Sequence, residues 1–126
     1  MRQDICHYYE AALPAVYNAY ARVAKEKFGC KCDYHNQYKL SFGLKFSLKY
    51  NMNGGVCTIH LMPCQTGTAV NVRFTLVQLA GARYKAYDED LTKNVASLLG
   101  AYTSILSSDP DQFERFIEDQ RLNGKL

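Results

Sequence analysis

The sequence predicts an α+β fold in which helices pack on one face of a three-stranded antiparallel sheet. Apolar residues recur at three- and four-residue steps near the N-terminus and again after residue 88, which is typical of amphipathic helices. Between these regions, apolar and polar residues alternate over residues 38–50, as in a strand with one buried face. The predicted order is an N-terminal helix, a three-stranded β-meander and two C-terminal helices (α-β-β-β-α-α), in a single domain of residues 1–126.

The first predicted helix extends from about Gln3 to Phe28. Pro14 lies inside this segment, and an interior proline removes a backbone hydrogen bond and crowds the preceding turn. We therefore expect a kink near residues 10–13 or a break into two helices. Gly29 is expected to end the helix, because glycine adopts positive φ angles without a steric penalty. The apolar stripe consists of Ile5, Tyr8, Tyr9, Ala12, Leu13, Val16, Tyr20, Val23 and Ala24.

Three strands follow in the predicted meander. The first, Tyr38–Tyr50, has an apolar or aromatic residue at every second position. Residues 51–55 are rich in asparagine and glycine, which favours a tight turn into a second strand, Val56–Met62. A further turn at residues 63–67 leads to the third strand, Thr68–Leu79.

Two helices are predicted after the meander. The first begins near Asp88 and continues to about Leu106, and residues 107–110 combine a stop with the start of a third helix. The apolar residues of this third helix are Phe113, Phe116 and Ile117. Helices lying side by side would cover one sheet face and leave the other face open.

Charge is segregated along the chain. No Asp or Glu occurs in the 54 residues 34–87, which contain six basic residues, whereas the remaining segments hold nine basic and twelve acidic residues. The sheet region is therefore expected to be basic, although the whole chain carries only +3. The candidate site is the open sheet face, where five residues are expected to gather: Lys39, Lys45, Lys49, His60 and Arg73.

Such a basic, hydroxyl-rich face suits phosphates or carboxylates. The first functional hypothesis is accordingly a non-enzymatic binding or interaction module, whose partner is an acidic protein, a second copy of the chain in a homodimer, or a polyanion. The competing explanation is that the lysines keep a long strand soluble and discourage edge-to-edge pairing. Nucleic acid is less favoured, because the helix after the meander begins with Asp88-Glu89-Asp90, where double-stranded-RNA-binding domains carry a lysine cluster.

The second hypothesis is a small-ligand-binding protein. The chain has ten tyrosines, whose apolar rings and polar hydroxyls suit the boundary of a core or the wall of a pocket. Tyr17, Tyr20, Tyr38 and Tyr50 could line a cavity between helix and sheet. Core edge is the alternative role for these residues.

An enzyme is the third hypothesis, with a site assembled from residues distant in sequence. No nucleophile elbow, P-loop or dinucleotide-binding glycine motif occurs, and no cofactor is expected. Cys30-Lys31-Cys32 with His35 lacks the usual zinc spacing, so no metal site is expected. The odd number of cysteines, five, favours free thiols and a reducing, cytoplasmic location. No signal segment or spanning helix is predicted, and no membrane partner is expected.

Overall fold

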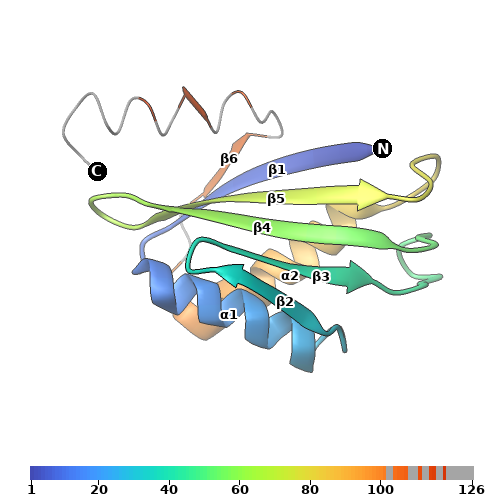
Figure 1. Cartoon of the computed structure of the whole chain (residues 1–126), viewed down its shortest axis with the longest axis horizontal. Helices are drawn as coiled ribbons and strands as arrows, with labels where there is room; N and C mark the ends of the chain where they lie inside the picture. The colour runs from blue at the N-terminus through green and yellow to red at the C-terminus, as the bar shows by residue number, and fades with distance from the viewer. Residues whose placement is uncertain (102–103, 108–110, 112–113, 116–117, 119–126) are drawn as a thin grey trace.

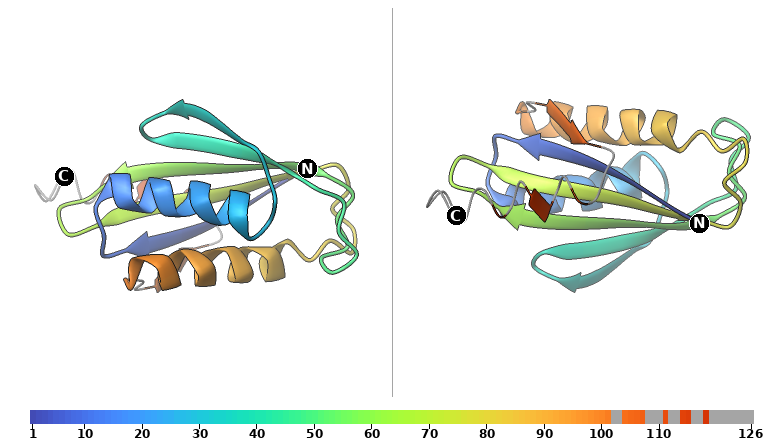
Figure 2. Two further views of the ribbon diagram at one scale, coloured as in Figure 1. Left: turned by 90° about the horizontal axis from the view of Figure 1, so that it is seen from below. Right: turned by 90° about the horizontal axis from the view of Figure 1, so that it is seen from above.

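A computed structural model of the chain describes residues 1–101, 104–107, 111, 114, 115 and 118. Its strands form one antiparallel sheet in the order β2-β3-β4-β5-β1-β6 (Figure 1). The strands are β1 (Arg2–Tyr9), β2 (Cys32–Asn36), β3 (Lys39–Leu44), β4 (Gly55–Pro63), β5 (Thr68–Leu76) and the short β6 (Ser104–Ser107). Helices α1 (Leu13–Glu26) and α2 (Tyr84–Leu99) lie side by side against the same sheet face, as Figure 2 shows.

The α+β class and the antiparallel sheet are confirmed, but the predicted three-stranded meander with three helices is wrong. The described part of the chain has two helices, and five strands of the sheet run from β2 at one edge to β1. The largest difference lies at the N-terminus, where residues predicted to be helical form β1. This strand pairs with β5 and extends the meander on its far side.

The sequence of β1 does not show the pattern of a strand, because residues on both faces of β1 are buried. His7 points toward the helices and Asp4 toward the opposite face, and both are almost fully enclosed. A buried polar residue on each face removes the alternation that identifies a strand. The predicted kink at Pro14 is absent from α1, because Pro14 occupies the first turn of this helix, where its missing N–H has no helical partner to lose. Gly29 has φ +64° and follows the helix end, as expected.

The predicted strand over residues 38–50 is also wrong in its second half. Strand β3 ends at Leu44, and the chain continues as a loop that is closed by a two-residue bridge between Ser47 and Met52. Strand β2, which was not predicted, pairs with β3 and forms an edge of the sheet. The alternation over residues 45–50 is therefore a property of a loop that turns some side chains inward and others outward.

Strands β4 and β5 occur where they were expected, with a turn between them at residues 64–67. Their buried faces also agree with the prediction. Alternate residues of both strands point toward the helices and form the centre of the core: Cys57, Ile59, Leu61, Val70, Val72, Phe74 and Leu76.

Helix α2 begins before Asp88 and ends at Leu99, and Gly100 caps it in a left-handed conformation with φ +65°. The prediction that this helix continues to Leu106 is wrong, because residues 104–107 form β6 beside β1. The predicted apolar residues of a third helix, Phe113, Phe116 and Ile117, lie outside the described residues.

Candidate functional site

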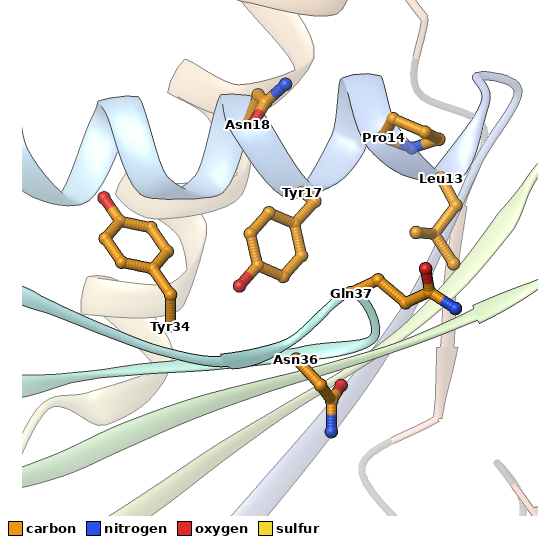
Figure 3. A pocket seen from close by; sticks show the side chains of 7 residues that line it. All are labelled: Leu13, Pro14, Tyr17, Asn18, Tyr34, Asn36 and Gln37. Atoms are coloured by element: carbon orange, nitrogen blue, oxygen red, sulfur yellow. The ribbon is translucent and has the colours of Figure 1, made fainter.

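A groove runs between the first half of α1 and the β2–β3 hairpin (Figure 3). Its volume is about 400 Å³. Two tyrosine rings, one from the helix and one from the strand, stand across from each other in it. The full lining is Leu13, Pro14, Tyr17, Asn18, Tyr34, Asn36 and Gln37.

The helix contributes its lining residues through its periodicity. Leu13 and Tyr17 are four residues apart and therefore lie on one side of α1, while Val16 and Tyr20 are fully buried toward the sheet. The Tyr17 hydroxyl donates a hydrogen bond to the backbone carbonyl of Lys39 over 3.3 Å, which ties this side of the helix to β3. The groove thus sits at the boundary of the core.

Tyr34 forms the strand side of the groove. Its side chain is 56 % exposed, and its ring centroid lies 6.3 Å from that of Tyr17 with the planes tilted by 35°. Burial, followed by the neighbouring Tyr34, raises the pKa of Tyr17, so its hydroxyl is protonated at neutral pH. The two rings therefore present apolar faces together with hydroxyl donors.

Three amide side chains also belong to the lining of the groove. Asn18 extends from the helix, and Asn36 and Gln37 come from the end of β2 and the turn that follows it (Figure 3). All three are exposed. An amide offers both hydrogen-bond donors and an acceptor. The Asn36 oxygen accepts a hydrogen bond from the backbone N–H of Tyr38 over 2.8 Å, so Asn36 offers its NH₂ group to a peptide carbonyl or a hydroxyl.

Along α1, past Tyr34, the groove adjoins a smaller hollow of about 220 Å³. Asn18 and Tyr34 line both parts, so the two are neighbours. The second part is charged: Lys25 lies in it, and Arg22 pairs with Glu26 over 3.1 Å. The groove therefore changes from aromatic near the start of α1 to charged near its end.

Strand β2 forms the outer wall. It stands last in the strand order, so in the described part of the chain no other strand pairs with its outer edge. Residues 33–36 of this strand are exposed. An edge strand carries backbone N–H and C=O groups that are available to another chain.

The five predicted basic-face residues do not all come together. Lys39, His60 and Arg73 do share the face opposite the helices, and Lys39 lies directly across from His60 on the neighbouring strand. Lys45 and Lys49 leave this group because β3 ends at Leu44. Both line a separate cavity near the end of α1.

An acidic residue also enters the face that was expected to carry none. Asp4 of β1 lies across from Arg73, and its carboxylate accepts hydrogen bonds from Arg73 (2.9 Å), Asn71 (3.0 Å) and Arg2 (3.0 Å). The expectation of an acid-free sheet came from a count over residues 34–87, which omits β1. The charge of Arg73 is consequently offset by a neighbouring carboxylate.

The imidazole of His60 contributes little positive charge. Burial and the adjacent Lys39 lower its pKa, and Glu114 opposes them with a smaller effect. His60 is therefore neutral at pH 7. Within this face, Lys39 is the group whose charge is least offset by the contacts described above.

The four tyrosines predicted to line a cavity separate as well. Tyr17 lines the groove, whereas Tyr20 is fully buried and hydrogen-bonded to Tyr9 over 2.8 Å. Tyr50 is buried and donates its hydroxyl to Asp90. Tyr38 is exposed on the hairpin but does not line the groove. Tyr34 was missed because β2 is short and has no apolar alternation that would have marked it as a strand.

A buried histidine–carboxylate pair lies elsewhere in the core. The Nε2–H of His7 donates to the Asp88 carboxylate at 2.9 and 3.1 Å, and both side chains are excluded from solvent. Neither lines the groove. Among the described residues, no three His, Cys, Asp or Glu side chains form a group that could hold a metal ion. Cys30 and Cys32 are buried free thiols, and burial raises the pKa of each.

No protein-family model matches the chain, and no curated protein matches its sequence.

Proposed function

We propose that this protein is a non-enzymatic binding module that accepts an extended segment of a partner protein in the groove between α1 and β2. The observation that carries the proposal is the position of the groove, between a helix and an edge strand whose outer side has no strand beside it in the described part of the chain. The lining of its aromatic part consists of tyrosine, amide and apolar side chains and includes no histidine, cysteine or carboxylate, while the carboxylate of the charged part, Glu26, is paired with Arg22. These groups suit recognition better than acid–base or nucleophilic chemistry.

Strand addition explains how such a groove would bind a peptide. An extended segment placed along β2 pairs its backbone with the free N–H and C=O groups of that strand. Successive side chains of the segment then point to opposite sides, so every second one faces α1. The backbone supplies affinity and the groove supplies selectivity.

The lining defines the preferred side chains. An aromatic ring or a proline can pack against the exposed surface that the Tyr17 and Tyr34 rings form together, and nearby amides can bind the adjacent peptide groups. Farther along, Lys25 favours an acidic side chain. We therefore expect an aromatic or proline residue followed or preceded, at a distance of two or four positions, by an acidic residue.

The basic sheet face remains a prediction as a second contact surface. Lys39, His60 and Arg73 are together, but Asp4 and the neutral state of His60 reduce its positive charge. The groove is the better-supported site because it joins a cavity, aromatic rings and a free strand edge in one place.

A small organic molecule is the second candidate ligand, and the cavity volume favours it. About 400 Å³ falls within the roughly 300–1,000 Å³ typical of small-molecule sites. A planar ring packed against the Tyr17 and Tyr34 rings, with polar substituents toward Gln37, fits this lining.

Peptide selection with the full chain tests the proposal. A displayed library of random ten-residue peptides should yield a consensus with an aromatic or proline residue and an acidic residue two or four positions away. Tyr34→Ala should weaken binding of the selected peptide at least about tenfold, in line with loss of an aromatic anchor. The matched control is Tyr38→Ala, an exposed tyrosine of the same hairpin outside the groove, which should leave the affinity unchanged.

Backbone methylation then separates the two candidates. Strand addition requires that N-methylation at every second peptide residue abolishes binding while methylation at the intervening residues is tolerated. A selection that gives no consensus, or a peptide whose binding ignores methylation, would exclude strand addition. Equal binding of the Tyr34→Ala variant would exclude the groove for either kind of ligand.

A further inference from the structure

The loop of residues 45–53, between β3 and β4, exposes apolar side chains at one end of the molecule. Leu48 is 85 % exposed and Phe46 is 67 % exposed. Val77, 68 % exposed, lies beside the same end, since it follows β5 and its backbone N–H bonds to Gly54. These are the three most exposed large apolar side chains in the described part of the chain.

The loop is held in place by hydrogen bonds, so this exposure is a feature of an ordered segment. Ser47 and Met52 exchange backbone hydrogen bonds of 2.9 and 3.0 Å, and the Asn51 side chain donates to the Gly81 carbonyl over 2.9 Å. Arg83 donates from its backbone to Tyr50 and from its guanidinium to the Lys49 carbonyl. The same loop buries Tyr50 and Met52, so it presents Phe46 and Leu48 outward from a fixed base.

Basic residues accompany the exposed apolar ones. A cavity of about 340 Å³ beside the loop is lined by three lysines, Lys27 from the end of α1 and Lys45 and Lys49 from the loop. Ser47 and Phe46 also line it. The Lys49 ammonium lies 3.3 Å from an Asp90 carboxylate oxygen, so Lys27 and Lys45 supply most of its unbalanced charge.

We propose that this end of the molecule docks on an anionic lipid surface, with Phe46 and Leu48 inserted into the headgroup region and Lys27 and Lys45 against lipid phosphates. Exposed apolar side chains can insert at the boundary of the acyl chains, while neighbouring lysines bind the negative headgroups. The loop offers both kinds of side chain together. A protein partner would instead need an apolar surface of its own to cover two side chains that are more than half exposed. Lysine stems can lie along the apolar layer while their ammonium groups reach the phosphates.

The association would be peripheral. In the part of the chain that the structure describes, no helix has the length and apolar character needed to cross a membrane. The proposal departs from the sequence-based expectation of no membrane partner, because that expectation considered spanning segments. The aromatic part of the peptide groove lies at the β2–β3 turn, at the opposite end of the sheet from this loop (Figure 1). The charged part of the groove reaches Lys25, two residues before Lys27, so a docked molecule would leave the aromatic part facing the solvent.

Vesicle co-sedimentation of the full chain tests the proposal. We expect binding to phosphatidylcholine vesicles that contain about 30 % phosphatidylserine, weak binding to pure phosphatidylcholine, and loss of binding in about 0.5 M salt, where charges are screened. The double variant Phe46→Ser/Leu48→Ser should bind at least about tenfold more weakly, because the apolar contribution is removed. The control is Leu98→Ser, an exposed leucine on α2, which should bind like the wild type.

Further measurements decide between explanations. Circular dichroism should show the same melting temperature for the double variant and the wild type, since both side chains are solvent-exposed. If the melting temperature of the double variant is lower, the charge variant Lys45→Glu replaces it in the vesicle experiment. Millimolar glycerophosphoserine should not displace the wild type from vesicles, whereas displacement would reassign the cavity to a soluble anion and overturn membrane docking. No binding to anionic vesicles, or a concentration-dependent dimer in light scattering that the double variant loses, would overturn it as well.

Discussion

Two buried carboxylates on opposite faces of the sheet show how differently one fold can treat the same chemical group. Asp4 lies on the face away from the helices and Asp88 on the face toward them, and each side chain is about 3 % exposed. The Asp4 carboxylate accepts hydrogen bonds from Arg2, Asn71 and Arg73, whereas His7 is the side-chain donor that the structure places on Asp88. Both side chains are nearly inaccessible to solvent, but Asp88 lies deeper among protein atoms than Asp4 and has fewer side-chain donors around it.

The pKa values shift in opposite directions as a result. Burial raises the pKa of Asp88, and the hydrogen bond from His7 offsets this only in part. Burial would likewise raise the pKa of Asp4, but the hydrogen bonds from Asn71, Arg73 and Arg2 together outweigh it and hold the pKa below its ordinary value. The comparison indicates that the donors around a carboxylate, weighed against its depth, decide whether its charge is favoured.

The largest expected effect comes from removing the donor to Asp88. His7→Leu deletes the hydrogen bonds of 2.9 and 3.1 Å and leaves the carboxylate in an apolar site. We expect the free energy of unfolding at pH 7 to fall by about 3–5 kcal/mol, as for a buried pair that loses one partner. Urea denaturation followed by circular dichroism would measure the change.

The double variant His7→Leu/Asp88→Leu supplies the control for that experiment. Replacing both partners removes the buried charge, so it should recover part of the lost stability. If the double variant instead has a lower free energy of unfolding than His7→Leu alone, removing the Asp88 charge brings no gain. That result would show that the unpaired Asp88 charge does not cause the destabilisation of His7→Leu.

The same two faces explain which parts of the fold the sequence reveals. Strands β4 and β5 were predicted because Cys57, Ile59 and Val72 alternate with polar residues that face away from the helices. Strand β1 was not, because His7 and Asp4 are polar yet buried, one on each face. Their partners, Asp88 and Arg73, are more than sixty residues away in the sequence, so local pattern could not indicate that these charges are compensated.

The helix side of the groove could be predicted from the sequence, but the strand side could not. Tyr17 belongs to a helix with clear periodicity, so its position between core and solvent could be expected. Tyr34 depends on β2, five mostly polar residues that become a strand by pairing with β3. Tertiary contact, rather than local propensity, determines such a strand. The prediction that Lys45 and Lys49 lie on the open sheet face was wrong for the opposite reason. Their segment has the alternation of a strand, but strand pairing stops at Leu44, before either residue.

A smaller effect is expected from neutralising Asp4, and it should depend on pH. Asp4→Asn keeps the shape but removes the charge that Arg73 and Arg2 bind, at a cost of about 1–2 kcal/mol at pH 7, given that both arginines are partly exposed. Because the pKa of Asp4 is lowered in the native state, its stabilising charge is fully present above the ordinary value of about 3.9 and is lost as the pH falls below it. The difference between wild type and variant should therefore shrink between pH 5 and pH 2.

The matched control is Asp33→Asn, an exposed aspartate on β2. Its stability should stay within about 0.5 kcal/mol of the wild type at neutral pH. A constant difference between wild type and Asp4→Asn over the whole acid range would contradict the assignment of the stabilising effect to the ionised carboxylate.

The smallest expected effect, and the sharpest test of the comparison, is the opposite pH dependence of Asp88→Asn. Since the pKa of Asp88 is raised in the native state, the folded protein holds this proton more tightly than the unfolded chain does. The wild type therefore loses stability relative to the variant as the pH rises from about 3.9 through the raised native value, and the loss is limited because His7 stabilises the ionised form. Urea midpoints at half-unit steps between pH 3 and pH 6 would resolve the trend against that of Asp4→Asn. Parallel trends for the two variants would mean that burial alone governs both carboxylates, and the distinction between the faces would then fail.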